Sequence, residues 1–258
     1  MSPARPPRAS RKALVLVVLL AFLLPVAARA TWFAFEGGPR SWSDADWSSI
    51  GSLPAARSYP AARVLVMSGR TGGWKGVVAA HSWIVVKREN APGWTRFDVV
   101  GWGSPVRING WAPDGRWFGD RPAVVADVSG AEAEKLIPRV EAAVKAYQYR
   151  NAGDYRIWPG PNSNTFVATV LRAIPELGAV MPPNAIGRDF RPSFYAGLSD
   201  SRTGVELNLW GIAGAKIGWV EGIEVNFLGL VAGVDVRHPA LKLPGFGRIG
   251  LPAVATST

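Results

Sequence analysis

The chain has 258 residues, which is enough for one compact domain or for one domain with an added layer. With 48% hydrophobic and 19% charged residues it is too apolar for a disordered chain, and the absence of cysteine excludes disulfides, thiolate metal sites and thiol nucleophiles. The formal net charge is +10, but five basic residues and no acidic ones lie in residues 1–30, and no basic run follows. We therefore expect no nucleic-acid partner. The two histidines form no metal-binding pattern, and we expect neither a metal nor a cofactor.

The N-terminus has the pattern of an export signal. Four basic residues in the first 12 are followed by an uncharged apolar run of 16 residues, 13–28, with Pro25 as a helix breaker and small residues at positions 28 and 30. The run is shorter than the roughly 20 residues that cross a bilayer as a helix. Cleavage after Ala30 and retention as a membrane anchor both stay open, with cleavage favoured. The basic flank predicts export of the rest of the chain, into the periplasm or anchored to the inner membrane and facing the periplasm.

The central part of the chain predicts a sheet. Residues 31–60 are rich in Trp, Ser and Gly without a sustained period, and we expect an irregular arm over the core. Short apolar or alternating runs between turn signals then predict four strands, at 62–67, 80–87, 94–100 and 121–128. The second and third strands are joined by Glu-Asn-Ala-Pro-Gly, which favours a hairpin.

Two helices are predicted after these strands. Ser129 or Gly130 can cap the first, and Pro138 is expected to kink it or to divide it into two short helices. The second helix follows Asn162-Ser163-Asn164, a cluster of residues typical of N-caps, and ends before Pro175. Its other positions are apolar nearly all round. We therefore expect this helix to be central, with its polar N-terminus opening at the surface or in a cleft.

The C-terminal part differs in composition from what precedes it. Polar and apolar residues alternate between glycines over 205–209, 222–228 and 229–237, which predicts an antiparallel meander with one face in water. We place a boundary near Gly197. The predicted fold class is α+β, in three parts: a signal peptide or anchor over 1–30, a core over 31–197 and an antiparallel β region over 198–258.

A serine is the candidate nucleophile in a chain without cysteine. Ser163 lies at the start of the central helix, where free backbone N–H groups can stabilise an oxyanion. Its general base would be His81, which begins a strand, with Asp98 from the neighbouring strand to orient the imidazole. The alternative is ordinary capping by Ser163 and its neighbours Asn162 and Asn164, an inert His81 and an exposed Asp98. Asn162 and Asn164 are also candidate binding residues.

Tryptophans form a second functional signal. Six of the 12 lie within residues 74–117, around the predicted strands and the loop that follows. Aromatic faces suit sugar rings, and the predicted compartment contains peptidoglycan. We take Trp83, Trp102 and Trp158 as candidate binding residues, for peptidoglycan or for an envelope protein or peptide. The alternative is that these rings belong to the core and to hairpin pairs.

Two motifs carry a resemblance to known families. The strand His81-Ser-Trp-Ile-Val-Val86 and the helix start Asn162-Ser-Asn-Thr-Phe166 resemble the circularly permuted papain-like fold of the PPPDE and NlpC/P60-like proteins, with serine where those families have cysteine. The resemblance covers about 105 residues and implies a papain-like core. Over the whole chain, AHSWIVVK, WPGPNSNTF and PPNAIGRDF resemble a bacterial family known as domain of unknown function 3750, which implies no activity.

Three functions remain open from the sequence. The first is a non-catalytic binding or scaffolding module of the cell envelope, and the second is a serine-dependent hydrolase or acyltransferase that acts on peptide or acyl bonds. The third is a structural role at the membrane. The hydrolase requires Ser163 and His81 side by side at an open cleft, because a serine hydroxyl must lose its proton as it attacks. The membrane role predicts an exposed apolar patch on the C-terminal meander.

Overall fold

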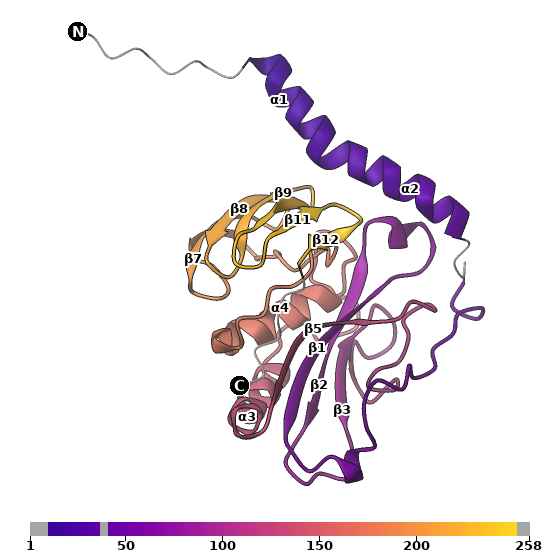
Figure 1. Ribbon diagram of the computed structural model, residues 1–258. Coiled ribbons are helices and arrows are strands. Elements are labelled where there is room, and N and C mark those ends of the chain that lie inside the picture. The colour runs from indigo at the N-terminus through magenta and orange to yellow at the C-terminus, as the bar shows by residue number, and fades with distance from the viewer. Residues whose placement is uncertain (1–9, 37–40, 252–258) are drawn as a thin grey trace.

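A computed structural model describes residues 10–36 and 41–251, with a long N-terminal helix, two antiparallel sheets and two further helices that pack on the first sheet (Figure 1). The mixture of helix and sheet confirms the predicted α+β class. Two residues of the N-terminal basic cluster, Arg5 and Arg8, lie outside the described residues.

The N-terminal helix is longer than the sequence predicted. It consists of α1 (Arg11–Val18), a π-helical turn η1 (Leu19–Leu23) and α2 (Leu24–Glu36), and it continues through Pro25 and past Ala30. The six residues after Ala30, expected in an irregular arm, are therefore helical. By length and composition this 26-residue helix is sufficient to cross a membrane. Most of its apolar surface is exposed, and only its C-terminal end approaches the first sheet (Figure 1).

The first sheet has the strand order β4-β3-β2-β1-β5, and every pair is antiparallel. Its strands are β1 (Arg63–Arg70), β2 (Ala80–Lys87), β3 (Thr95–Val99), β4 (Val106–Ile108) and β5 (Ala123–Ser129). Single 3-10 turns, η2 (Ala56–Ser58) and η3 (Gly73–Val77), flank β1. The four predicted strands and the hairpin are confirmed, whereas the three-residue strand β4 was not predicted.

The two faces of this sheet carry different cores. One face packs on α3 (Ala131–Lys145), on α4 (Ser163–Ala173) and near the short turn η4 (Pro175–Leu177), through Val64, Val66, Ile84, Val86, Phe97 and Val99. The other face buries Leu65, Met67, Trp83 and Val85 beneath a tryptophan-rich layer that includes Trp47, Trp111 and Trp117. The helix α3 is a single helix with Pro138 inside it. The expected division into two helices is therefore wrong.

The second sheet is a seven-stranded meander that starts at Phe194, so β6 straddles the predicted boundary at Gly197. Its strands are β6 (Phe194–Leu198), β7 (Gly204–Leu209), β8 (Ala213–Gly218), β9 (Gly222–Phe227), β10 (Leu230–Asp235), β11 (Ala240–Leu243) and β12 (Gly247–Gly250). The tight turns at Trp210-Gly211 and Leu228-Gly229 place all four of these residues at positive φ, the conformation of a type I′ hairpin turn.

The second sheet turns its charged face toward the protein and its apolar face outward. Glu206, Lys216, Glu224 and Lys242 are each buried, whereas Val205, Ile217, Ile223 and Leu241 are exposed. The alternation predicted from the sequence is present, but the face expected in water is the one that packs on the core.

The buried charges of this sheet form one network with the loop that follows η4. Lys216 Nζ lies 2.7 Å from Asp189 Oδ1 and 2.9 Å from Asp200 Oδ2. Arg191 binds Asp200 and Glu206, and Arg188 binds Glu224. The charges therefore pair with one another across the interface, which is the arrangement that makes buried ions tolerable.

Candidate functional site

The structure brings His81 and Asp98 together. The Nε2–H of a neutral His81 donates to Asp98 Oδ1 at 2.8 Å, and the guanidinium of Arg96 donates to both oxygens of the same carboxylate, at 2.7 and 3.0 Å. Arg96 also donates to the carbonyl of Ala112 and stacks over Trp83. Asp98 and Arg96 have no exposed side-chain surface. The orienting role predicted for Asp98 thus has its geometry, and the exposed carboxylate is excluded.

Burial sets the protonation states of this group. Burial lowers the pKa of His81, and the hydrogen bond and the charge of Asp98 only partly oppose that effect. Burial by itself would raise the pKa of Asp98, but the hydrogen bond from His81 and the charge of Arg96 hold it below its ordinary value. The resting state is therefore a neutral imidazole beside a carboxylate paired with arginine.

The predicted pairing of Ser163 with His81 is not formed. Along β2, His81 shares its face with Trp83 and Val85, while Ser82 and Ile84 point to the face that carries α4. The imidazole stacks on Trp117, with ring centroids 3.6 Å apart, and both belong to the tryptophan-rich side. Ser163 begins α4 on the opposite side of the sheet. Within the described residues, no hydrogen bond joins the two side chains.

The residues around Ser163 connect three segments of the chain. Asn162 caps α4 by accepting from the N–H groups of Asn164 and Thr165, and its amide donates to the carbonyls of Ile157 and Ile186. Asn164 Nδ2 donates to the carbonyls of Ala80 and Ile186. The candidate binding residues Asn162 and Asn164 therefore hold α4 to β2 and to the loop after η4. Their amides are engaged by the protein itself.

The three candidate tryptophans have different surroundings. Trp83 is fully buried and donates from Nε1 to the carbonyl of Pro113, so its ring cannot stack on a ligand, which corrects its predicted role. Trp102 is about half exposed and contacts Trp42 and Trp111 edge-on. Trp158 is also half exposed, and its Nε1 donates to the carbonyl of Leu228 in the second sheet.

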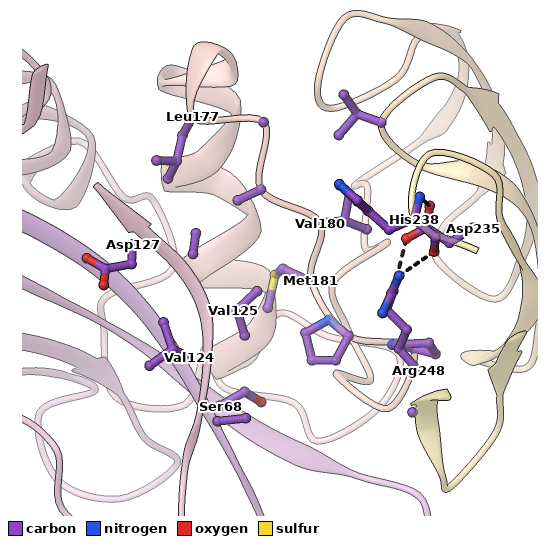
Figure 2. A pocket seen from close by; sticks show the side chains of 18 of the residues that line it. Ser68, Val124, Val125, Asp127, Leu177, Val180, Met181, Asp235, His238 and Arg248 are labelled. Carbon is purple, nitrogen blue, oxygen red and sulfur yellow. Dashed lines mark hydrogen bonds and ion pairs between the residues drawn. The ribbon is translucent and has the colours of Figure 1, made fainter. Parts of the chain in front are cut away.

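A cleft of about 1050 Å³ lies between the two sheets, away from the His81 side of the first sheet. Residues 123–128 of the edge strand β5 form one wall, and residues 175–184 line it as well. The opposite wall comes from the second sheet, near β10, β11 and β12. Figure 2 shows Val124, Val180 and Met181 between the two sheets, with His238 and Arg248 facing them. The cleft therefore joins an apolar floor to a charged wall.

The charged wall is organised by Asp235. Arg248 Nε donates to Asp235 Oδ2 at 2.9 Å, and the backbone N–H of His238 donates to Asp235 Oδ1 at 3.0 Å (Figure 2). Arg248 also donates to the carbonyl of His238. These bonds hold the turn between β10 and β11 against the end of β12. The imidazole of His238 lines the cleft as part of this rigid wall.

Two arginines leave the cleft with an excess of positive charge. Four of its five acidic side chains form ion pairs: Asp127 with Arg63, Glu132 with Lys135, Glu176 with Arg139 and Asp235 with Arg248. The fifth, Asp120, accepts a hydrogen bond from the backbone N–H of Arg70, which also lines the cleft. Arg121 and Arg237 also line the cleft, and neither forms an ion pair within the described part of the chain. An anionic group on a ligand would find both guanidinium groups available.

Sequence reasoning did not find this cleft. Val124 and Met181 are ordinary apolar residues in the sequence, and Arg121 and Arg237 are isolated basic residues 116 positions apart. His238 is followed by Pro239 and has no recognisable motif around it. Only the packing of the second sheet beside β5 brings these residues together.

The fold and the cleft define an α+β protein of two antiparallel sheets. A family model described as "Protein of unknown function (DUF3750)" matches residues 61–190. Because the match covers just over half of the chain, the chain belongs to this family. The matched region contains the first sheet, α3, α4 and the loop through Phe190, and it ends before the second sheet begins. No curated protein and no solved structure matches the chain.

Proposed function

We propose that the protein is a non-catalytic binding module of the bacterial cell envelope, and that its ligand is an extended peptide segment held in the cleft. The observation that carries this proposal is the open edge of β5. Among the described strands, β5 pairs only with β1, and six consecutive residues, 123–128, border the cleft. Because successive side chains of a strand point to opposite faces, such a run faces the cleft with its backbone edge.

An open strand edge is a template for a further strand. Natural proteins usually cover or charge such an edge, because it pairs with other chains. Here the cleft gives the edge a bounded space with an apolar floor at Val124 and Met181. A peptide added to β5 would gain backbone hydrogen bonds, and the floor would select its apolar side chains. Arg121 and Arg237 favour an acidic side chain or a C-terminal carboxylate on this peptide.

The N-terminal helix supplies the membrane attachment in this proposal. Retention is favoured over cleavage after Ala30 because the residues around that point pack on the body of the protein. Arg29 is buried, and the ring of Phe33 contacts that of Trp74, which lies outside the helix. Cleavage would remove these contacts. In this proposal the module uses a papain-like scaffold for binding, and its Ser163 and His81 do not form a catalytic pair.

The experiment is site-specific photocrosslinking in cells that produce the full chain. A benzophenone amino acid replaces Val124, which lines the cleft, or Ile108, an exposed residue on the opposite edge strand of the same sheet. We expect an adduct at position 124 that protease digests and muramidase leaves intact, and none at position 108. The captured segment is then identified by mass spectrometry, synthesised and added to the purified chain in detergent.

The synthetic peptide provides the decisive measurement. It should slow hydrogen exchange of the β5 amides, and Val124→Asp should weaken its binding by tenfold or more while Ile108→Asp leaves binding unchanged. An adduct that muramidase digests would show that the ligand is peptidoglycan and not a peptide. Equal labelling at both positions would remove the cleft as the binding site.

A further inference from the structure

The outer face of the second sheet is a continuous apolar surface. Register pairing places one large apolar residue from each of the seven strands in a single row: Leu198, Val205, Ile217, Ile223, Val234, Leu241 and Ile249. Each of these side chains is between 38% and 60% exposed. A second row, which contains Leu207 and Val225, and a third, which contains Leu209 and Phe227, lie beside it. Soluble monomers rarely expose a contiguous apolar surface of this kind.

The strands are oriented so that this face stays apolar. On β7, β8 and β9 the residues that alternate with the apolar row are Glu206, Lys216 and Glu224, and all three are buried in the charge network on the inner side. Burial of these charged side chains on the inner face costs desolvation free energy, while the apolar side chains of the sheet stay exposed on the outer face. In water alone the opposite orientation would be the stable one, since burial favours apolar side chains.

The N-terminal helix meets this same face. Phe22, the buried residue of η1, contacts Phe227 of the third row edge-on, with ring centroids 6.0 Å apart. Next to this contact the helix exposes Leu19 and Leu23. One apolar surface thus continues from the helix onto the sheet, and the helix is long enough to lie within a membrane.

We propose that the outer face of the second sheet rests on the lipid bilayer, beside the helix that anchors the chain. Acyl chains are the occupant that accounts for both surfaces at once, because a second copy of the sheet would leave the exposed side of the helix uncovered. Trp210 and Trp219 lie in the turns at opposite ends of β8 and are both exposed. Tryptophan is enriched at the membrane–water interface, which suits these rim positions.

This inference rests on the membrane anchoring within the proposed function, and the experiment separates the two. The chain has no cysteine, so single cysteines can be introduced one at a time into the full chain and spin-labelled. The positions are Val15 on the helix, Ile217 on the sheet and Ile108 on the first sheet, each more than half exposed. Each labelled protein is reconstituted into vesicles of phosphatidylethanolamine with a minor share of phosphatidylglycerol. Collision rates with oxygen and with a water-soluble nickel chelate are then measured by electron paramagnetic resonance.

The expected result is an oxygen-to-nickel collision ratio several-fold higher at positions 15 and 217 than at position 108. If the collision ratio at position 217 equals that at position 108 while the label at position 15 is still in lipid, the contact of the sheet with the bilayer is overturned and the helix remains as the anchor. Aqueous ratios at all three positions would overturn the anchor as well. A label at 217 shielded from both reagents and broadened by a neighbouring label would assign the face to a second copy and also overturn the proposal.

Discussion

The imidazole of His81 lies parallel to the indole of Trp117, with ring centroids 3.6 Å apart and an interplanar angle of 5°. This stacking holds the histidine on the tryptophan-rich side of the first sheet, where its Nε2 meets Asp98. The same contact directs the ring away from α4. A catalytic histidine must reach its nucleophile, so the position of Trp117 decides against a Ser163–His81 pair.

Asp98→Asn is expected to destabilise the protein by about 3–5 kcal/mol, because it leaves the guanidinium of Arg96 buried without its counter-ion. Thermal unfolding in detergent, followed by circular dichroism, measures the change. Glu141→Gln provides the control, since Glu141 pairs with Arg88 at the exposed surface and such pairs contribute about 0–1 kcal/mol. Equal effects of the two substitutions would contradict the buried network.

Stability should fall as pH drops below about 6.5, the ordinary pKa of histidine. Burial lowers the pKa of His81, so in this range the unfolded chain binds more protons than the folded chain. The contribution is complete above pH 6.5 and is lost as pH falls through the folded pKa. His81→Gln should flatten the melting temperature between pH 5 and 7, within the range where unperturbed histidine titrates. A wild-type profile already flat in that range would count against this account.

Lys216→Met is expected to cost about 3–5 kcal/mol, because Asp189 and Asp200 lose the buried cation they share. Burial alone would raise the pKa of Asp189, but Lys216 and Arg188 lower it to about 2. The substitution should therefore also move the loss of stability on acidification to higher pH. Lys135→Met, at an exposed pair with Glu132, should leave both the unfolding free energy and its pH profile nearly unchanged.

Ser163→Ala should be nearly neutral, whereas Asn162→Ala should cost about 1–2 kcal/mol as a lost helix cap. Urea unfolding of the two variants compares them.

A fluorophosphonate probe should leave the wild-type chain unlabelled under conditions in which a known serine hydrolase reacts, because no general base adjoins Ser163 within the described residues. Labelling that disappears in both Ser163→Ala and His81→Ala would instead show an activated serine.

The sequence predicted the first sheet well because its strands are short apolar runs between turn signals. The strand over 80–87 agrees with β2 at both ends. The helix start at Ser163 was also predicted, since Asn162 is a strong cap. The strand β8 was not predicted, because Ala213-Gly-Ala-Lys-Ile-Gly218 has too few large side chains to show a period. Its role is visible only once its neighbours are paired.

The candidate site was harder to predict because it depends on which face each strand buries. A period of two residues assigns side chains to two faces without saying which one packs inward. For β2 this left open whether His81 faced α4 or the tryptophans. For β7 and β9 it favoured the wrong face, since the partner of Glu206 is Arg191, which lies 15 residues earlier and outside the alternating pattern.

The buried charge row has a consequence for how the second sheet finds its alignment during folding. If β8 slid by two residues against β7, every apolar side chain would still point outward, so hydrophobicity would not oppose the slip. Lys216 would then lie opposite Gly204 or Asn208 instead of Glu206, and its ammonium group would move away from Asp189 and Asp200, the two carboxylates closest to it. The ion pairs therefore stabilise one register of these strands and disfavour the registers that are shifted by two residues.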